Sequence, residues 1–151
     1  MQFVPSKINR FLLFKLPSAW IAGIRVKEIT DKKAVVTATH KWINQNPFQS
    51  IYFAVLAMGA ELSTGILVMK KIQDSGRNIS MLVTHMEADF TKKAKGKIRF
   101  ICEDGDLIDE KIRKTIETGE GYTFDLHSRA FDEKGDEVCH FTFQWSIKLK
   151  N

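Results

Sequence analysis

The sequence is poor in the residues that mark secreted, disulfide-linked or zinc-binding proteins. Only two of its 151 residues are cysteines, Cys102 and Cys139. Neither has the CxxC or CxxH spacing of a metal site. A disulfide framework or a zinc site is therefore not expected, and isolated thiols favour the reducing cytoplasm.

Motifs that bind nucleotides or activate a serine nucleophile are also missing. The sequence has no P-loop, no dinucleotide-binding glycine fingerprint and no nucleophile elbow. His85, His127 and His140 lack the spacing of metal ligands, so we interpret them as surface or hydrogen-bonded sheet residues. We expect neither a metal nor a tightly bound cofactor.

The sequence has fewer acidic residues than basic ones, 18 Asp and Glu against 23 Lys and Arg. The net charge of +5 and the pI near 9.2 favour anionic partners such as coenzyme phosphates, nucleic acid or lipid headgroups. No Lys/Arg-rich block with interleaved aromatic residues is present, so nucleic-acid binding is not expected and is kept only as a third hypothesis. With 44% hydrophobic and 27% charged residues, the composition is that of an ordinary globular protein, and residues 1–151 are predicted to form one domain.

A long hydrophobic run near the N-terminus is likewise absent. The run from Phe11 to Trp20 is interrupted by Lys15 and Pro17 and is too short for a signal core, so secretion is not expected. The apolar spacing instead predicts an amphipathic helix that packs on the domain, within an N-terminal extension of residues 1–20. Its apolar residues are Ile8, Phe11, Leu12 and Leu16. Attachment to a membrane surface is the alternative interpretation.

One segment, from Ser50 to Lys71, is almost continuously apolar. Its Ala, Leu, Met and Val residues fall on every side of a helical wheel, which predicts a helix that is buried all round. A membrane span is the alternative, but Glu61, Ser63 and Thr64 lie in the middle and no second apolar segment follows. We therefore interpret this segment as a core helix and expect no membrane span.

The rest of the chain is predicted to be rich in strands. Two β-branched runs between Gly23 and Lys41 flank a polar turn at 30–33, which is the pattern of a hairpin. Residues 107–118 form either a short helix or an irregular connection. Further strands are predicted at 79–90, 97–103, 122–131 and 138–149, the last with clear alternation of apolar and polar residues.

This order of elements predicts an α+β fold in which a curved antiparallel sheet wraps around a long central helix. A helix without a polar face is buried only if the sheet curls around most of it. Contact with a partner chain commonly completes such an enclosure. This physical requirement favours a hotdog architecture.

Glu61 is the most distinctive chemical feature. It is the only acidic or basic side chain between Trp42 and Lys70, and it projects from an otherwise apolar helix. Burying a bare carboxylate costs several kcal/mol unless the group is paired, hydrogen-bonded or protonated. One explanation is a structural hydrogen bond or an ion pair at a subunit interface. The other, which we favour, is a catalytic carboxylate whose pKa is tuned by its environment.

Several stretches carry a resemblance to a known family. Asn46 stands 61 − 46 = 15 residues before Glu61, and taken alone it is an ordinary loop or capping residue. Residues 46–54 (NPFQSIYFA), Glu61, residues 63–65 (STG) and residues 86–94 (MEADFTKKA) together resemble the loop, central helix and third strand of hotdog-fold thioesterases. The resemblance is to their poorly characterised acyl-CoA thioesterase-like branch, and it covers nearly everything from Gly23 onward.

The resemblance implies a site at a dimer interface. Asn46 and Glu61 are then catalytic residues contributed by opposite chains of a homodimer, with a dimer of dimers left open. An acyl-CoA or acyl-carrier substrate places its acyl group in an apolar tunnel, and coenzyme A is part of the substrate. The substrate-binding and oxyanion-stabilising positions are Ser50, Tyr52, Phe53, Thr64 and Thr84. The CoA phosphates are attracted by Lys92, Lys93 and Lys95, for which a solvated bend is the alternative.

The predicted function is thioester hydrolysis. Glu61 acts as general base or nucleophile, and Asn46 with a backbone amide at the helix start holds the carbonyl oxygen. Many members of the better-known branch carry His-Gly-Gly where this sequence has Tyr52, Phe53 and Ala54, and a Ser found in some relatives corresponds to Val83. A non-catalytic acyl-CoA or lipid-binding protein is therefore the alternative.

Overall fold

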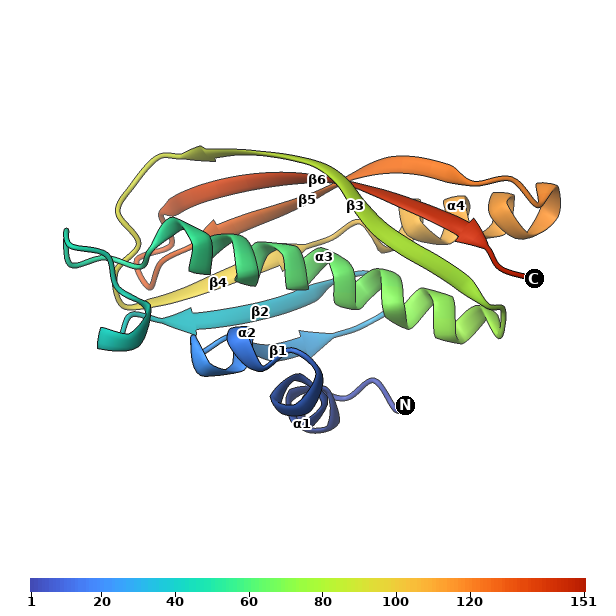
Figure 1. Cartoon of the computed structure of the whole chain (residues 1–151). Helices are drawn as coiled ribbons and strands as arrows, with labels where there is room; N and C mark the ends of the chain where they lie inside the picture. Colours follow the sequence, from blue (N-terminus) through green and yellow to red (C-terminus); the bar gives the residue numbers. More distant parts are fainter.

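The fold is built from one curved sheet and one long helix. The computed structural model describes residues 1–151, and its six strands form one antiparallel sheet in the order β1-β2-β4-β5-β6-β3. The sheet wraps around α3, Phe53–Ser75 (Figure 1), which confirms the predicted architecture. The strands are β1 Arg25–Ile29, β2 Ala34–Thr39, β3 Ile79–Phe90, β4 Lys97–Cys102, β5 Tyr122–Phe131 and β6 Glu137–Leu149.

The strands follow the sequence pattern closely. β3 and β5 have the predicted bounds, whereas β4 ends one residue earlier and β6 starts one residue earlier than predicted. In β6 the buried residues Phe141, Phe143 and Trp145 alternate with half-buried polar ones. Side chains on a strand point to opposite faces in turn, so this alternation gives the sheet an apolar face toward α3.

α3 begins and ends later than the apolar pattern predicts. Residues before Phe53 are held by other parts of the chain, because Ile51 pairs with Gln45 and donates its amide to the Ala94 carbonyl at 2.9 Å. The helix ends at Gly76, whose φ of 69° is the left-handed conformation that closes many helices. α3 is the one helix long and apolar enough to cross a membrane, but most of it is buried in the core of this fold.

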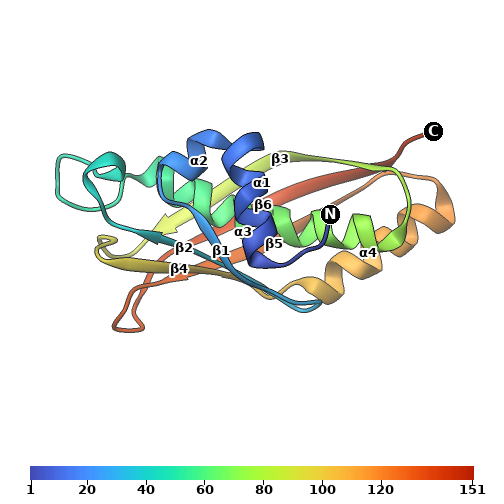
Figure 2. The same cartoon turned by 90° about the horizontal axis from the view of Figure 1, so that it is seen from below.

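The N-terminal extension forms two helices outside β1, α1 Pro5–Lys15 and α2 Pro17–Ile21 (Figure 2). Asn9 fixes α1 to β1, because its side chain accepts a hydrogen bond from the Val26 amide at 2.8 Å and donates one to the Val26 carbonyl at 3.0 Å. Ile8 and Leu12 are buried as predicted. The prediction for Leu16 was wrong: the chain turns there, ahead of Pro17, and Leu16 is exposed.

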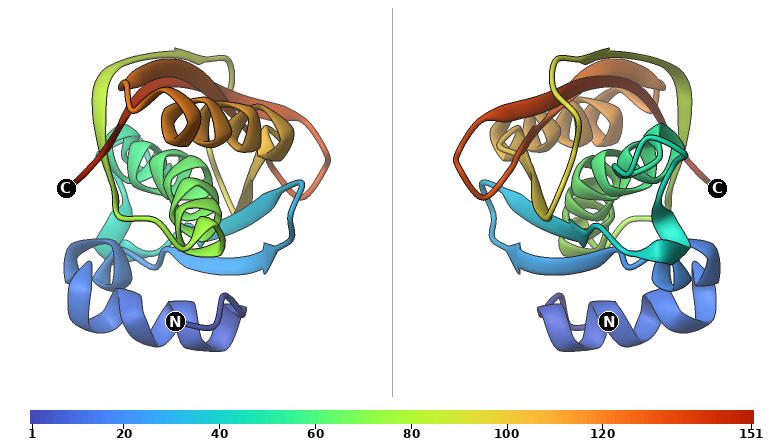
Figure 3. Two further views of the ribbon diagram at one scale, coloured as in Figure 1. Left: turned by 90° about the vertical axis from the view of Figure 1, so that its right-hand side faces the viewer. Right: turned by 90° about the vertical axis from the view of Figure 1, so that its left-hand side faces the viewer.

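The segment after β4 is a helix, α4 Gly105–Thr118, which resolves the open alternative in favour of regular structure. Ile108 and Ile112 are buried on its inner face. The ammonium group of Lys71 on α3 pairs with Asp109 at 2.8 Å, which links the two helices. α4 thus covers part of the core that the sheet leaves open (Figure 3).

Candidate active site

An uncovered stripe runs along the first half of α3. Ala54, Ala57, Met58 and Glu61 are only half-buried, although the following residues from Leu62 to Val68 are all buried. Their spacing of three and four residues places them on one face of the helix. A single chain therefore leaves open the face of its core helix that carries Glu61, the one acidic residue in the apolar part of the helix.

Glu61 lies on this open stripe without a partner in the protein. Its carboxylate forms none of the hydrogen bonds and ion pairs made by the other acidic side chains, and partial burial raises the pKa of Glu61. One carboxylate oxygen lies 3.4 Å from the position that a Cβ on Gly65 would occupy. The absence of a side chain at Gly65 leaves room for the carboxylate to fold back along the helix.

Contacts and hydrogen bonds hold the side chains next to Glu61 in place. The Trp145 ring lies 3.2 Å from the same Cβ position on Gly65, and its indole N–H donates to the Thr64 hydroxyl at 2.9 Å. Thr64 in turn donates to the Glu61 carbonyl oxygen at 2.9 Å. Thr64 is fully buried and its hydroxyl is engaged, so it positions the helix and the indole and does not face open space.

Asn46 organises the loop before α3. Its side-chain oxygen accepts hydrogen bonds from the amides of Phe48, at 2.9 Å, and Ser50, at 3.2 Å. Its amide nitrogen donates to the Ser50 hydroxyl at 2.9 Å and, over a longer 3.4 Å, to the Ile51 carbonyl. The hydrogen bond to the Ile51 carbonyl is the weaker of the two because it is longer. The N–H of Asn46 that makes it is therefore the one that can most easily donate to a ligand instead.

A surface hollow brings several predicted residues together. It has a volume of about 410 Å³ and lies between the loop before α3, the start of α3 and the segment after β3. Asn46, Ser50, Phe53, Lys92 and Lys93 all line it. The hollow therefore joins the predicted carbonyl-binding residues to two of the predicted phosphate-binding lysines.

The first turn of α3 offers backbone donors to this hollow. The first hydrogen bond of the helix is made by the Val55 amide to the Tyr52 carbonyl at 2.9 Å, and no side chain caps the helix. The amides of Phe53 and Ala54 are therefore free at the positive end of the helix dipole. Aromatic rings crowd the same place, since Phe53 meets Tyr52 at 5.0 Å and Phe90 at 6.4 Å between ring centroids.

The predicted lysines differ in their surroundings. Lys92 pairs with Asp132 at 2.7 Å and with Asp136 at 2.8 Å, so its charge is already balanced by the β5–β6 hairpin. Lys93 lies 5.8 Å from the centre of the Phe48 ring and is exposed, as is Lys95. Lys93 and Lys95 pair with no carboxylate, so they are the ones free to meet an anion.

Thr84 and Glu61 are not brought to the hollow in a single chain. Thr84 donates to the Gln144 side chain at 2.9 Å and lies with it on the solvated face of the sheet. Glu61 follows Phe53 by 61 − 53 = 8 residues, about 12 Å of helix at roughly 1.5 Å per residue. One chain alone therefore does not place its carboxylate beside its own Asn46.

Sequence reasoning missed two aromatic residues of the site, Trp145 beside Glu61 and Phe90 in the hollow. Both were predicted only as strand residues. The alternation in β6 shows that Trp145 faces α3, but no sequence signal places its ring against Gly65. The structure gathers no group of three or more His, Cys, Asp or Glu side chains that could hold a metal ion.

A curved antiparallel sheet wrapped around a long central helix defines the hotdog fold. The chain belongs to the family described as Domain of unknown function (DUF4442), which matches residues 6–147. No curated protein matches the chain.

Solved structures share this fold over nearly the whole chain. A Pseudomonas aeruginosa protein called a probable thioesterase is 23% identical, with a TM-score of 0.82 and 97% of each chain covered. A Chlorobaculum tepidum protein of unknown function is 20% identical, with a TM-score of 0.82 over 97% of this chain and 94% of that one. A Haemophilus influenzae thioesterase is 13% identical, with a TM-score of 0.73 over 99% of this chain and 93% of that one. The shared fold confirms the predicted hotdog architecture.

Proposed function

We propose that this protein hydrolyses acyl thioesters, with acyl-CoA as the substrate class. The observation that carries the proposal is the unpaired carboxylate of Glu61 on the open face of an apolar helix. A carboxylate with a raised pKa binds a proton more readily, which suits a general base. Support also comes from the fold, because one of the similar solved structures is called a thioesterase and another a probable thioesterase.

In the proposed reaction Glu61 removes a proton from a water molecule, whose oxygen attacks the thioester carbonyl carbon. The carbonyl oxygen becomes an oxyanion, and the C–S bond then breaks. The leaving thiolate takes the proton from Glu61, so the products are a carboxylic acid and a thiol. The variant route, with Glu61 as nucleophile, forms an anhydride that water hydrolyses to the same products.

The oxyanion is held at the start of α3. The free amides of Phe53 and Ala54 and the turned side-chain N–H of Asn46 supply donors, and the helix dipole favours the developing negative charge. Ser50 supports this arrangement by fixing Asn46 through its hydroxyl. Exposed Lys93 and Lys95 attract the phosphates of coenzyme A near the same hollow.

A homodimer completes the site in this proposal. β3 is an edge strand, and it exposes the large apolar side chains Leu82, Met86 and Phe90. An exposed apolar edge of this length is a ready template for pairing with another chain. Twofold pairing at β3 covers the open stripe of α3 and sets Glu61 of one chain against the Asn46 loop of the other.

The protein is expected to work in the cytoplasm, because both of its thiols are free and buried. Burial also raises the pKa of Cys102 and of Cys139 to about 12, so neither thiol is ionised near neutral pH.

Hydrolysis of a panel of acyl-CoAs of increasing chain length tests the proposal. Wild-type protein is expected to release free thiol, and Glu61→Gln is expected to lower kcat by about 10²–10⁴-fold, the usual contribution of a general base. Glu117→Gln is the matched control, since Glu117 is exposed on α4 and does not belong to the proposed dimer edge. Comparable hydrolysis by wild type and by Glu61→Gln or Glu61→Ala contradicts the mechanism.

A second candidate is a non-catalytic acyl-CoA or lipid-binding protein. The observation that favours it is the aromatic crowding at the helix start, where Tyr52, Phe53 and Phe90 stand close together. Tight binding of acyl-CoA with no release of thiol, at every chain length, supports this candidate against the enzyme.

A further inference from the structure

The N-terminal helices carry positive charge without any compensating acid. Residues 1–27 contain no Asp or Glu and include Lys7, Arg10, Lys15, Arg25 and Lys27. No carboxylate pairs with the side chains of Arg10 or Lys15, and Lys7 donates only to the neutral amide of Gln2. The charge on α1 is therefore free to act on a partner.

The same helices expose large apolar side chains on the side away from the core. The buried residues Ile8, Leu12 and Ala19 hold the helices to the body. Phe14 is 72% exposed and Ile21 is 62% exposed, and Leu13 and Leu16 are also exposed. Unlike scattered single apolar residues, these side chains follow each other closely along one short segment.

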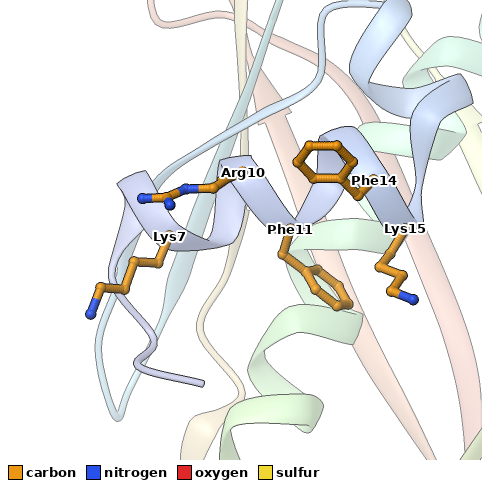
Figure 4. Close-up of a pocket in the computed structure, with 5 residues that line it drawn as sticks. All are labelled: Lys7, Arg10, Phe11, Phe14 and Lys15. Atoms are coloured by element: carbon orange, nitrogen blue, oxygen red, sulfur yellow. The ribbon is translucent and has the colours of Figure 1, made fainter.

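Cations and aromatic rings share one hollow on α1. Its volume is about 380 Å³, and its lining residues are Lys7, Arg10, Phe11, Phe14 and Lys15 (Figure 4). Phe11 points toward α3, whereas Lys7 and Lys15 extend at the two ends of the group (Figure 4). Exposed aromatic and aliphatic side chains flanked by Lys and Arg are the composition of helices that lie in a membrane interface.

We propose that α1 and α2 form a docking surface for an anionic lipid bilayer. The apolar side chains Leu13, Phe14, Leu16 and Ile21 enter the boundary between headgroups and acyl chains, and Lys7, Arg10 and Lys15 meet the lipid phosphates. Attachment is peripheral, because the helices are short and their inner face stays buried in the protein.

The positive charge of this surface favours an anionic bilayer over a second copy of the chain. Twofold pairing through this surface sets one group of unpaired cations against an identical group, which is repulsive. Nucleic acid fits less well, because Leu13, Leu16 and Ile21 are aliphatic and only Phe14 among the exposed apolar side chains offers a ring on which a base could stack. α1 packs on β1, and only the first residues of β3, Ile79 and Met81, line a hollow with Phe11 of α1. The apolar side chains of the proposed dimer edge, Leu82, Met86 and Phe90, lie further along β3.

Co-sedimentation of the full chain with vesicles tests the proposal. Wild type is expected to pellet with vesicles of phosphatidylglycerol and phosphatidylcholine, but not with pure phosphatidylcholine, and added salt is expected to release it. Phe14→Ser with Ile21→Ser is expected to weaken binding by about tenfold or more, the scale expected from losing two buried apolar side chains. Arg10→Glu with Lys15→Glu is expected to abolish binding.

Matched controls carry the same kinds of change elsewhere. Phe48→Ser removes an exposed aromatic side chain from the loop before α3, and Lys134→Glu reverses an exposed charge on the β5–β6 hairpin. Both are expected to bind like wild type, and circular dichroism checks that all variants are folded. The proposal is overturned if wild type ignores anionic vesicles, if the controls lose binding equally, or if the chain retains RNA or DNA but no vesicles.

Discussion

Glu61 is a carboxyl group in surroundings that disfavour its charge. Burial alone raises its pKa, with no ion pair or hydrogen bond to offset the effect. The charged form is the one that acts as a base. Activity is therefore tied to the pH at which this one side chain loses its proton.

A pH profile of kcat/KM follows from this shift. Because Glu61 must be ionised, kcat/KM is expected to rise with pH along an acidic limb whose midpoint lies above the ordinary glutamic acid value of 4.5. Initial rates with one acyl-CoA across the acidic range measure the limb. A midpoint at or below the ordinary value would exclude Glu61 as the base.

The same shift predicts the effect of Glu61→Gln on stability. At a pH below the pKa of the unfolded chain, Glu61 is protonated in both states and the variant should match wild type. As pH rises toward the raised pKa of the folded state, the unfolded chain loses the proton first, so wild-type stability falls relative to the variant. We expect the variant to be more stable near neutral pH by roughly 1 kcal/mol, the scale of an unsatisfied buried polar group.

Urea unfolding at acidic and neutral pH measures this difference. Glu117→Gln, at an exposed position on α4, should show no comparable gain. Equal stability of wild type and Glu61→Gln at neutral pH would mean that Glu61 is satisfied by a partner in solution.

At the scale of elements, α3 packs closely on the sheet at Gly59, where the absence of a side chain makes room for the ring of Phe100. A Cβ at this position would lie 2.4 Å from the ring of Phe100, which is fully buried on β4. Gly59→Ala is therefore expected to destabilise the fold by about 1–3 kcal/mol, although alanine is the better helix former. Chemical denaturation of Gly59→Ala, Phe100→Leu and the double variant measures the coupling. If the two losses simply add, the close contact is not the cause.

The predictability of elements depends on how local their causes are. β3, β5 and β6 were predicted well, because alternation and turn residues lie within each strand. The start of α3 was not predicted well, because Ser50 and Ile51 adjoin the apolar run but are held outside the helix by contacts with Asn46 and with Ala94. Those contacts join distant segments, and no periodicity records them.

For the site, sequence reasoning found the residues with unusual chemistry but not their neighbours. Glu61 was found because it is a single acidic residue in an apolar segment. Asn46 was found through the resemblance to hotdog-fold thioesterases. The pairing of Lys92 with Asp132 and Asp136 depends on how the β5–β6 hairpin folds back, which sequence spacing does not reveal.

At the scale of the whole molecule, the two halves of the proposed site lie apart in one chain. The hollow at the start of α3 contains Asn46, whereas Glu61 lies on the open stripe about two turns further along the helix. The β3 edge has unpaired backbone groups and exposed apolar side chains, and one face of α3 is uncovered. Contact with a second chain would bury both. The central claim is that two chains together assemble each thioester-hydrolysing centre.

Complementation between two inactive variants tests this claim most directly. Chains carrying Asn46→Ala and chains carrying Glu61→Gln are coexpressed with different affinity tags, and the mixed dimers are purified through both tags. If each centre takes Asn46 from one chain and Glu61 from the other, one of the two centres in a mixed dimer is intact, and about half of wild-type activity returns. Mixed dimers as inactive as either parent, alongside an active wild type, would contradict the claim.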